Sequence, residues 1–445
     1  MCVGMSFYNR AGVYEFNNQQ ENMPTKKNLS QWLEYLESLH PSEIDLGLAR
    51  VQNVARKMDL LKPAPLVIMV AGTNGKGSTV TMCSSILQQV PMKVGSYMSP
   101  HLHLYNERVK INGIPVSDDD LIESFKAIDE QRGDILLTYF EVGTLSSLYL
   151  FKKHSVDAAV LEVGLGGRLD AVNIVDPDIS VVTSIGLDHQ DWLGHDLAGI
   201  AFEKAGIYRG SRPAICGERQ PQATLVDHAA SINAPLYVKG EEFDFKEHVD
   251  SWDWNGVASD GQPIMYTKLP LPSLPIENAA TVLQALQFIC PQISLLDIHE
   301  GLVLAQLAGR MQNISKPFNA ILDVGHNAQA AEMLATRLVS RPVKGKRYAL
   351  LAMLNDKDPE GVVTALSPLV QSWHLAGISG FRGQTVVSLH DKVKSQLEGV
   401  QEHVDIEQAM DALLSIMQDD DELIILGSFI TVAKAQNWIK EHTNG

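Results

Sequence analysis

The sequence predicts an α/β protein with a doubly wound parallel sheet, followed by a smaller Rossmann-like α/β domain. The first part of the chain alternates helical periodicity, at 80–89, 118–129 and 144–154, with apolar runs at 66–70, 93–97, 158–163 and 179–185. Continuously apolar strands separated by helices are typical of parallel sheets covered on both faces. The same alternation starts again after residue 304, with apolar runs at 320–324, 348–353, 373–376 and 423–426. This restart predicts the second domain.

Further segments complete the predicted organisation. Asn28 or Ser30 can cap a first helix, and apolar residues recur at helical spacing within 46–60. Short aromatic and polar stretches alternate with turns over 239–275, which indicates a small antiparallel appendage before a further helix. The predicted division is an extension expected to be disordered at 1–22, a first domain at 23–304 and a C-terminal domain at 305–445. Either Met1 or Met23 could be the true start.

Composition excludes several classes of protein. The 445 residues are 45% hydrophobic and 20% charged, as in ordinary globular proteins of two or three domains. No apolar run approaches the roughly 20 residues of a membrane helix, and the N-terminus lacks a signal-peptide pattern. Four scattered cysteines favour a reducing compartment. We therefore expect a cytoplasmic protein without a membrane partner.

The charge balance restricts the partners further. A net charge of −17 argues against a nucleic-acid partner, because nothing would offset the repulsion by its phosphates. Anionic substrates would need a local basic site. Candidates for such a site are Lys76, Arg108, Arg168 and Arg310.

The most informative segment runs from an apolar strand through a glycine-rich turn into a helix that begins with hydroxyl residues. The turn contains Thr73, Asn74, Gly75, Lys76, Gly77 and Ser78. Glycines allow successive N–H groups to face one centre, and the helix N-terminus and the lysine add positive charge there. The strict pattern G-x-x-x-x-G-K-[ST] is not met, because Val70 replaces its first glycine and Gly77 separates Lys76 from Ser78. A purely structural turn is the alternative, but the lysine and hydroxyls favour a P-loop-type domain that binds nucleotide phosphates.

Polar residues follow three other predicted strands. Ser99, Glu162 and His189 each lie at or just after a strand end. In a parallel sheet these ends lie beside the phosphate-binding turn, so the three side chains could converge on Mg²⁺. Each alone is more often a surface or hydrogen-bonding group, whereas three at successive strand ends favour a metal site. For Lys204, spacing alone favours an exposed ion pair with Glu203. The residues by themselves thus indicate a two-domain enzyme that uses ATP and Mg²⁺.

Motifs spread over most of the chain resemble one family. They are IDLGL at 44–48, AGTNGKGS at 71–78, SPHL at 99–102, TYFE at 138–141, LEVGLGGRLDAVN at 161–173, TSIGLDHQDWLG at 183–194, EKAGI at 203–207, NAA at 278–280, GR at 309–310, DVGHN at 323–327 and DKD at 356–358. Together they are similar to the bifunctional dihydrofolate synthase/folylpolyglutamate synthase family, which is related to the Mur peptidoglycan ligases. The chain departs from the family pattern at Gly325 and Ala328, where the family often has alanine and proline, and at Ile430, where it often has histidine.

The resemblance implies an ATP-dependent ligase of folate biosynthesis. A substrate carboxylate would attack the γ-phosphate of ATP to give an acyl phosphate, and the amine of L-glutamate would then displace phosphate to form an amide. The acceptors would be 7,8-dihydropteroate, giving dihydrofolate, and tetrahydrofolate, giving polyglutamates. ATP is the implied co-substrate, Mg²⁺ at two sites is the implied cofactor, and a monomer is the family expectation.

The resemblance also assigns roles to residues. The implied catalytic residues are Lys76, Lys204 and His326, with Lys204 carbamoylated into an oxygen ligand. The implied ATP contacts are Thr73, Asn74, Gly75, Lys76, Gly77, Ser78, Asn278, Arg310 and Asp323. One Mg²⁺ would be held by Ser99 and Glu162, and a second by His189, with Lys204 as the further metal ligand. In the implied pterin site a carboxylate accepts N–H groups and Phe140 stacks on the ring. The implied contacts are Asp45, Leu46, Gly47, Thr138, Tyr139, Phe140, Glu141, Leu169, Asp170 and Ala171.

Alternatives in other classes stay open at this point. A Mur-type ligase would share the phosphate turn and metal positions but act on a UDP-sugar peptide. The about 65 residues before the first predicted strand are too few for its usual UDP-binding domain. A non-enzymatic, ATP-gated regulator would need neither metal ligands nor a pterin pocket. Within the family, one activity or two is possible, and the blocks at Asp45 and Thr138 favour both.

Overall fold

The computed structural model describes residues 27–40, 45–380 and 382–443. The predicted extension at 1–22, the choice between Met1 and Met23, and Cys2 lie outside the described residues. None of the helices in the described ranges is long and apolar enough to cross a membrane. Cys83, Cys216 and Cys290 are buried free thiols, as expected for residues that fill the core.

The first domain contains a sheet that is covered by helices. Its strands are β1 (Leu66–Ala71), β2 (Val94–Tyr97), β3 (Val109–Ile111), β4 (Ile114–Pro115), β5 (Ala158–Glu162), β6 (Ile179–Val182), β7 (Ala214–Cys216) and β8 (Leu236–Val238). Its helices are α1 (Leu29–Ser38), α2 (Ala49–Lys57), α3 (Lys76–Leu87), α4 (Asp118–Arg132), α5 (Tyr139–Lys153), α6 (Gln190–Leu193), α7 (Leu197–Ala205), α8 (Ala223–Ser231), α9 (Ile276–Ile289) and α10 (Leu295–Leu304), with short 3₁₀ turns η1 (Tyr105–Arg108) and η2 (Ala171–Ile174).

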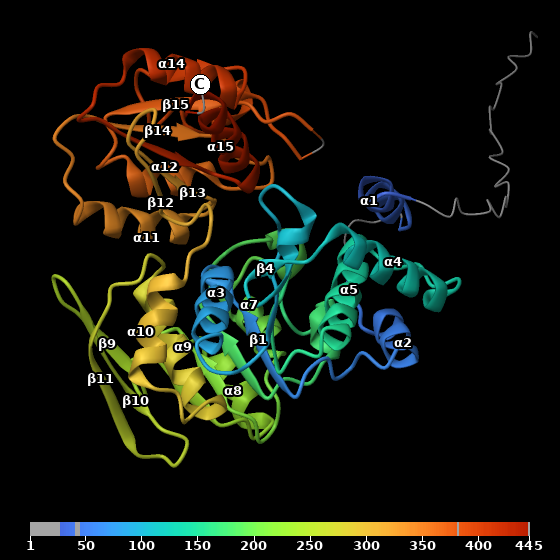
Figure 1. Ribbon diagram of the computed structural model, residues 1–445. Helices are drawn as coiled ribbons and strands as arrows, with labels where there is room; N and C mark the ends of the chain where they lie inside the picture. Colours follow the sequence, from blue (N-terminus) through green and yellow to red (C-terminus); the bar gives the residue numbers. More distant parts are fainter. Residues whose placement is uncertain (1–26, 41–44, 381, 444–445) are drawn as a thin grey trace, which may run out of the picture.

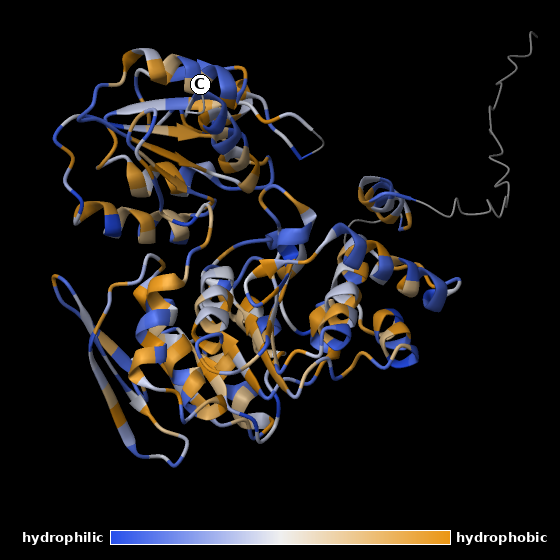
Figure 2. Ribbon diagram, in the orientation of Figure 1, coloured by the Kyte–Doolittle hydropathy of each residue, from blue (hydrophilic) through white to orange (hydrophobic). Residues whose placement is uncertain are grey.

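The order of the strands is β4-β3-β2-β5-β1-β6-β7-β8. Each neighbouring pair from β2 through β5, β1, β6 and β7 to β8 is parallel. Strand β3 pairs antiparallel with β2, and β4 pairs antiparallel with β3. Along β1, alternate side chains enter the two cores: Val67 and Met69 face α5 and α7, whereas Ile68 and Val70 face α3 and α9. The predicted doubly wound parallel sheet is therefore confirmed (Figure 1). Figure 2 shows the strands mainly apolar and the outer helix α4 mainly polar.

Element boundaries differ from the predicted ranges at several places, and three of the differences have a clear local reason. Helix α3 begins at Lys76 rather than residue 80, because Gly75 adopts φ +87° and turns the chain directly into the helix. Helix α5 begins at Tyr139 rather than 144, because Thr138 and Glu141 form a reciprocal capping box. Strand β6 ends at Val182, where the Thr183 hydroxyl bonds to the phosphate turn instead of the strand continuing to 185.

The predicted antiparallel appendage is also present. Strands β9 (Asp244–Glu247), β10 (Trp252–Val257) and β11 (Pro263–Leu269) form a sheet in the order β11-β10-β9. Trp252 and Trp254 are buried against α9, and the Trp254 indole donates to the Ala280 carbonyl oxygen at 3.0 Å. The appendage thus extends the core on the α9 face, away from the strand ends that face the C-terminal domain (Figure 1).

The C-terminal domain is a second, smaller α/β unit. Its elements are β12 (Gln312–Ile314), β13 (Ala320–Asp323), α11 (Ala328–Val339), β14 (Arg347–Leu351), α12 (Pro359–Leu366), β15 (Ser372–Ala376), α13 (Val386–Val393), β16 (Gln401–His403), α14 (Ile406–Ile416), β17 (Glu422–Leu426) and α15 (Phe429–Thr443). The strand order is β12-β13-β17-β14-β15-β16, parallel except for β12. The sequence analysis did not predict β12 and β16, because these short edge strands are polar and carry no apolar run.

Two histidines of this sheet form a buried pair. His374 on β15 and His403 on β16 stack with ring centroids 5.1 Å apart. Nδ1 of His374 lies 2.9 Å from Nε2 of His403, so one ring donates to the other, while Nε2 of His374 is buried without a partner. Burial, reinforced by the neighbouring His403, lowers the pKa of His374 to about 4.

We expect this pair to make the C-terminal domain acid-sensitive. The unfolded chain protonates His374 near pH 6.5 but the folded domain only near pH 4, so the unfolded state binds more protons between these values. The contribution of His374 to the free energy of unfolding is complete above about pH 6.5. It falls by up to about 3 kcal/mol as the pH drops to about 4. His374→Phe keeps a ring but removes the titration. Denaturant unfolding at about pH 7.5 and about pH 5 should show a smaller acid loss for the variant, and equal losses would contradict the expectation.

Candidate active site

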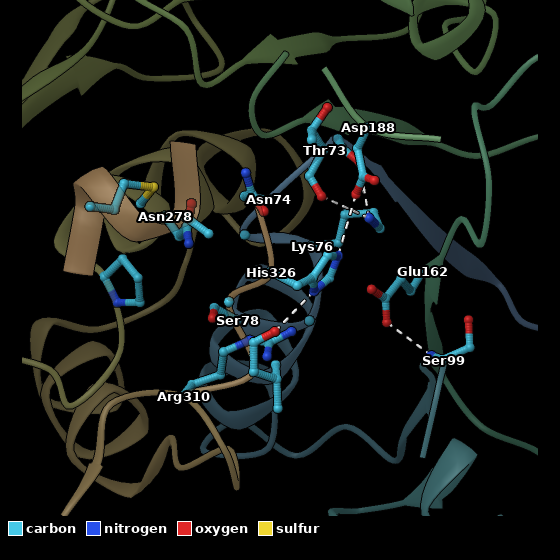
Figure 3. A pocket seen from close by; sticks show the side chains of 18 of the residues that line it. Thr73, Asn74, Lys76, Ser78, Ser99, Glu162, Asp188, Asn278, Arg310 and His326 are labelled. Atoms are coloured by element: carbon cyan, nitrogen blue, oxygen red, sulfur yellow. Dashed lines mark hydrogen bonds and ion pairs between the residues drawn. The ribbon is translucent and has the colours of Figure 1, made fainter. Parts of the chain in front are cut away.

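The carboxyl ends of β1, β5 and β6 and the carboxyl end of β13 face one another across the domain boundary. Open α/β sheets bind ligands at such strand ends. One cavity lies there and is lined from both domains. Figure 3 shows Lys76 and His326 near its centre, Asn278 and Arg310 on one side, and Ser99 with Glu162 on the other.

The phosphate turn is fixed by its contact with the loop after β6. Gly72 adopts φ +150°, and a Cβ at this position would lie 1.9 Å from the Thr183 hydroxyl oxygen. That hydroxyl donates to the Asn74 carbonyl oxygen at 2.6 Å. Thr73 exchanges two bonds of 3.0 Å with Gly186, since its hydroxyl donates to the Gly186 carbonyl and accepts from the Gly186 N–H. Only glycine at position 72 permits this close approach, so the turn and the β6 loop form one rigid unit.

Two glycines at the start of α3 also lie close to neighbouring side chains. A Cβ on Gly75 would lie 2.7 Å from the Asn278 amide oxygen. A Cβ on Gly77 would lie 3.3 Å from Leu307 and 4.0 Å from both carboxylate oxygens of Glu162. The N-terminus of α3 therefore lies directly beside Glu162, and the glycine that interrupts the strict phosphate-loop pattern avoids a tight contact with Leu307.

Lys76 lies folded over the turn that precedes it. Its ammonium donates to the carbonyl oxygens of Gly72 at 2.9 Å and Thr73 at 3.2 Å. Burial lowers the pKa of Lys76, although the charges of Glu162 and Asp188 oppose this shift. A lysine at the N-terminus of a helix, beside a glycine turn, is an arrangement that attracts a polyphosphate.

The predicted metal ligands lie around the same turn. The Ser99 N–H donates to Oε2 of Glu162 at 3.0 Å, so both side chains share one wall (Figure 3). Burial raises the pKa of Glu162, while Lys76 opposes this. Burial lowers the pKa of His189 to about 4, so its ring is neutral and has a lone pair for a cation. Within the described ranges no three His, Cys, Asp or Glu side chains form a metal cluster. This donor set fits Mg²⁺, which takes one or two protein oxygens and completes its shell with phosphate and water.

Lys204 differs from the exposed ion pair that its spacing predicts. It is buried on α7, and its neighbour Glu203 pairs with Arg168 at 2.7 Å instead. Among the described residues the Lys204 ammonium has no hydrogen-bond partner. Burial and the charge of Lys76 lower its pKa to about 7, so a large share of the amine is neutral near neutral pH. That expectation of an exposed ion pair is therefore wrong, because α7 turns Lys204 inward toward the cavity.

The predicted nucleotide contacts lie at the other end of the cavity. Nδ2 of Asn278 is buried without a partner beside Gly75. Arg310 lies 5.2 Å from the Phe429 ring centroid, and it forms no ion pair with any described carboxylate. Asp323 accepts from the N–H groups of Met311 at 2.9 Å and Gly325 at 2.7 Å. The free amide and the unpaired guanidinium fit a ligand that carries acceptors and negative charge, such as a nucleoside triphosphate.

Asp188 joins the two domains at the centre of the cavity. Its carboxylate lies 2.5 Å from the Lys357 ammonium and 3.4 Å from Nε2 of His326, both from the C-terminal domain. Despite burial, these partners hold the pKa of Asp188 far below its usual value. A second cross-domain contact runs from the Asn74 amide to Asn327 at 3.1 Å and to Gln329 at 2.7 Å.

The sequence analysis assigned no role to Asp188 or Lys357. Both fall inside quoted motifs, DHQDWLG and DKD. The available signal was therefore their position in these motifs, but linear spacing could not show that the two motifs meet across the domain boundary.

A second cavity, of about 490 Å³, lies next to the first and is also lined by Ser99 and His189. We call it the acceptor cavity, because the predicted contacts of the pterin acceptor lie in it. All of the predicted pterin contacts line it: Asp45, Leu46, Gly47, Thr138, Tyr139, Phe140, Glu141, Leu169, Asp170 and Ala171. The Phe140 ring covers Gly164, whose Cβ would lie 2.5 Å from the ring. The volume lies in the usual range for small-molecule sites.

The acidic residues of this cavity already have partners in the protein. Arg50 lies 2.6 Å from Asp45 and 2.9 Å from Glu141. Glu141 also accepts from the Thr138 N–H at 2.8 Å as part of the capping box. Asp170 accepts from the N–H groups of Leu165 and Val172, and burial raises its pKa to about 6. These carboxylates shape the wall of the cavity and keep further lone pairs for a ligand.

Comparison with known proteins places both domains in one superfamily. Residues 70–259 match the Mur ligase middle domain, and residues 309–429 match the Mur ligase glutamate ligase domain. The chain is 44% identical to the dihydrofolate synthase/folylpolyglutamate synthase of Escherichia coli, over 94% of this chain and 97% of that protein.

Solved structures are equally similar. Escherichia coli FolC in complex with DHPP and ADP superposes with a TM-score of 0.89 at 43% identity, covering 93% of this chain and 98% of that one. A bifunctional folylpolyglutamate synthase/dihydrofolate synthase with Mn, AMPPNP and L-glutamate bound gives a TM-score of 0.86 at 43% identity, covering 92% and 98%. Since fold and sequence agree over more than nine-tenths of its length, the chain belongs to the dihydrofolate synthase/folylpolyglutamate synthase family of Mur ligases.

Proposed function

We propose that this protein is an ATP-dependent ligase that adds L-glutamate to 7,8-dihydropteroate and to tetrahydrofolates. One observation carries the proposal: the nucleotide cavity and the acceptor cavity share a border. Ser99, His189 and His326 line both of them. A carboxylate at this border can face the terminal phosphate of ATP in the turn after β1. Holding two reactants in a reactive orientation can remove about 7–11 kcal/mol from the activation barrier.

The chemistry follows from the charges at this border. The acceptor carboxylate attacks the γ-phosphorus and ADP leaves, which gives an acyl phosphate. The amine of L-glutamate then attacks the acyl carbon, phosphate leaves and an amide forms. Lys76 and the N-terminus of α3 stabilise negative charge on the transferred phosphoryl group. His326 lies at the border where the glutamate amine must arrive, which supports an assisting role for it.

The donors present fit magnesium at two sites. Ser99 and Glu162 would hold one ion, and His189 with a carbamoylated Lys204 would hold the second. When bound there, Mg²⁺ would supply positive charge that offsets the negative charge of the phosphates. A pKa of about 7 for Lys204 supports carbamoylation, because only a neutral amine adds CO₂. The carbamate would replace an unpaired buried ammonium by an oxygen ligand.

Names of relatives support the substrates. The Escherichia coli relative is named for both activities, and FolC was solved with DHPP and ADP. A related enzyme was solved with Mn, AMPPNP and L-glutamate. The proposal also includes tetrahydrofolate as the second acceptor, the ATP and pterin contacts named above, a monomeric state and a cytoplasmic location.

The direct test is an assay with purified protein, MgATP, 7,8-dihydropteroate and labelled L-glutamate, repeated with tetrahydrofolate. Labelled product with both acceptors, dependent on Mg²⁺ and lost with a chelator, is expected. Product with tetrahydrofolate alone would mean that the acceptor cavity is misassigned for dihydropteroate. ATP hydrolysis without either product would favour a Mur-type ligase with another carboxylate substrate.

Lys76→Ala should reduce turnover by about 10²–10³-fold or more, because it removes the cation beside the transferred phosphate. The fold should persist, since the hydrogen bonds of the Lys76 ammonium within the described residues go to two carbonyl oxygens of its own turn. Lys152→Ala is the matched control, because Lys152 pairs with the exposed Asp59 far from the cavity. Circular dichroism and steady-state kinetics check both variants, and near-normal activity of Lys76→Ala would contradict its role.

Lys204→Ala should lose activity and regain part of it in acetate or formate, because a small carboxylate can replace the carbamate oxygens. The same salts should not restore Lys76→Ala, which lacks a cation rather than an oxygen ligand. Activity measured against carboxylate concentration checks this. If Lys204→Ala is inactive and no carboxylate rescues it, the amine acts as a plain ammonium.

A further inference from the structure

Arg108 is a buried cation with no acidic partner among the residues that the structure describes. It belongs to η1, is only 8% exposed and lines the acceptor cavity but not the nucleotide cavity. Among the described residues no carboxylate lies within ion-pair distance of its guanidinium. The sequence analysis named it as a basic candidate, and the proposed function leaves it without a role.

The surroundings hold this guanidinium in place without neutralising it. Its Nε donates to Nδ1 of His101 at 2.9 Å. Burial and the charge of Arg108 lower the pKa of His101 to about 4, so His101 is neutral and accepts. The guanidinium lies 5.1 Å and 5.5 Å from the ring centroids of Tyr105 and Tyr139. These contacts use one N–H group and the faces of two rings, and they leave the terminal amino groups free.

The nearest acidic neighbour in the sequence is engaged elsewhere. Glu107 accepts from the N–H groups of Leu102, His103 and Leu104 at 2.8 to 3.0 Å. By contrast, Arg50 pairs with Glu141, and the buried Arg347 pairs with Glu422. A buried charge is costly unless an opposite charge or hydrogen bonds compensate it. Arg108 therefore has the character of a site whose anion is supplied by a ligand.

The position of Arg108 identifies this anion. Phosphates bind on the other side of the border, where Lys76 and Arg310 lie, so the anion belongs to the acceptor. Dihydropteroate has a single carboxylate, which must reach the border to react. Tetrahydrofolate ends in a glutamate with two carboxylates, one of which reacts while the other needs a place within the acceptor cavity.

We propose that Arg108 binds the non-reacting carboxylate of the terminal glutamate of folate acceptors, and so selects for them over dihydropteroate. The inference rests on the proposed function and deepens it. A guanidinium can bind a carboxylate with two parallel N–H···O bonds, and the two free amino groups of Arg108 permit this geometry. Dihydropteroate would leave this contact unused, which lets one cavity serve both acceptors.

The test compares three acceptors with the full-length enzyme: tetrahydrofolate, its analogue in which the non-reacting carboxylate is a carboxamide, and dihydropteroate. The wild type should use the carboxamide about 10- to 100-fold less well in kcat/KM than tetrahydrofolate, mainly through KM. Arg108→Met should show a similar loss with tetrahydrofolate, little further loss with the carboxamide and near-normal use of dihydropteroate. Arg108→Lys, which keeps the charge but not the paired bonds, should fall between.

Arg132→Met is the matched control, because Arg132 pairs with Asp129 on α4 outside both cavities. Equal losses of Arg108→Met with all three acceptors would mean a purely structural role and would overturn the proposal. An increase in KM for L-glutamate with both acceptors would assign the anion to the incoming amino acid instead, which also overturns it. If the wild type used tetrahydrofolate and its carboxamide equally well, this result would overturn the proposal without any variant. A wild type inactive with dihydropteroate would instead contradict the proposed function.

Discussion

The contact between Gly72 and Thr183 is the constraint on which the rest of the site depends. The backbone of the turn after β1 lies against the first residue beyond β6, at a distance that excludes any side chain at position 72. The Thr183 hydroxyl then bonds to the Asn74 carbonyl, and the turn enters α3 at Gly75 without a connecting loop. Because these contacts join the backbone of the turn to a residue directly after a sheet strand, the helix N-terminus and Lys76 are positioned before any ligand arrives.

The second structural requirement is that two domains meet at one place. Asp188, directly before His189, pairs with Lys357 and faces His326, so one carboxylate links the predicted metal ligand to the glutamate ligase domain. Removing one partner of a buried ion pair typically costs about 3–5 kcal/mol, because the other charge stays buried and unpaired. This pair therefore stabilises the relative position of the domains that brings both cavities to a common border.

The distribution of charge explains how a chain with net charge −17 can handle anions. Most of its arginines are neutralised by carboxylates, as Arg50 and Arg168 are. Lys76, Arg310, Lys204 and Arg108 are the exceptions among the described basic residues that line the two cavities, and each lies where the proposed chemistry needs a negative group. Phosphate would meet Arg310, CO₂ would convert Lys204 into an anionic ligand, and a substrate carboxylate would meet Arg108. Cations that no described carboxylate pairs with, rather than the overall charge, mark the binding surfaces.

The sequence by itself determined the parallel sheets, the phosphate turn and the family, because these depend on local patterns: apolar strands, a glycine turn before a helix, and motifs in order. It also placed Ser99, Glu162 and His189 at strand ends, which a parallel sheet brings together. Only the tertiary structure decided what depends on distant packing. It turned Lys204 inward, joined Asp188 to Lys357 across 169 residues and paired Asp45 and Glu141 with Arg50. It also left Arg108 without a carboxylate partner in the described part of the chain. Linear spacing carries no information about which charges become buried together, since burial and pairing are properties of the packed domains.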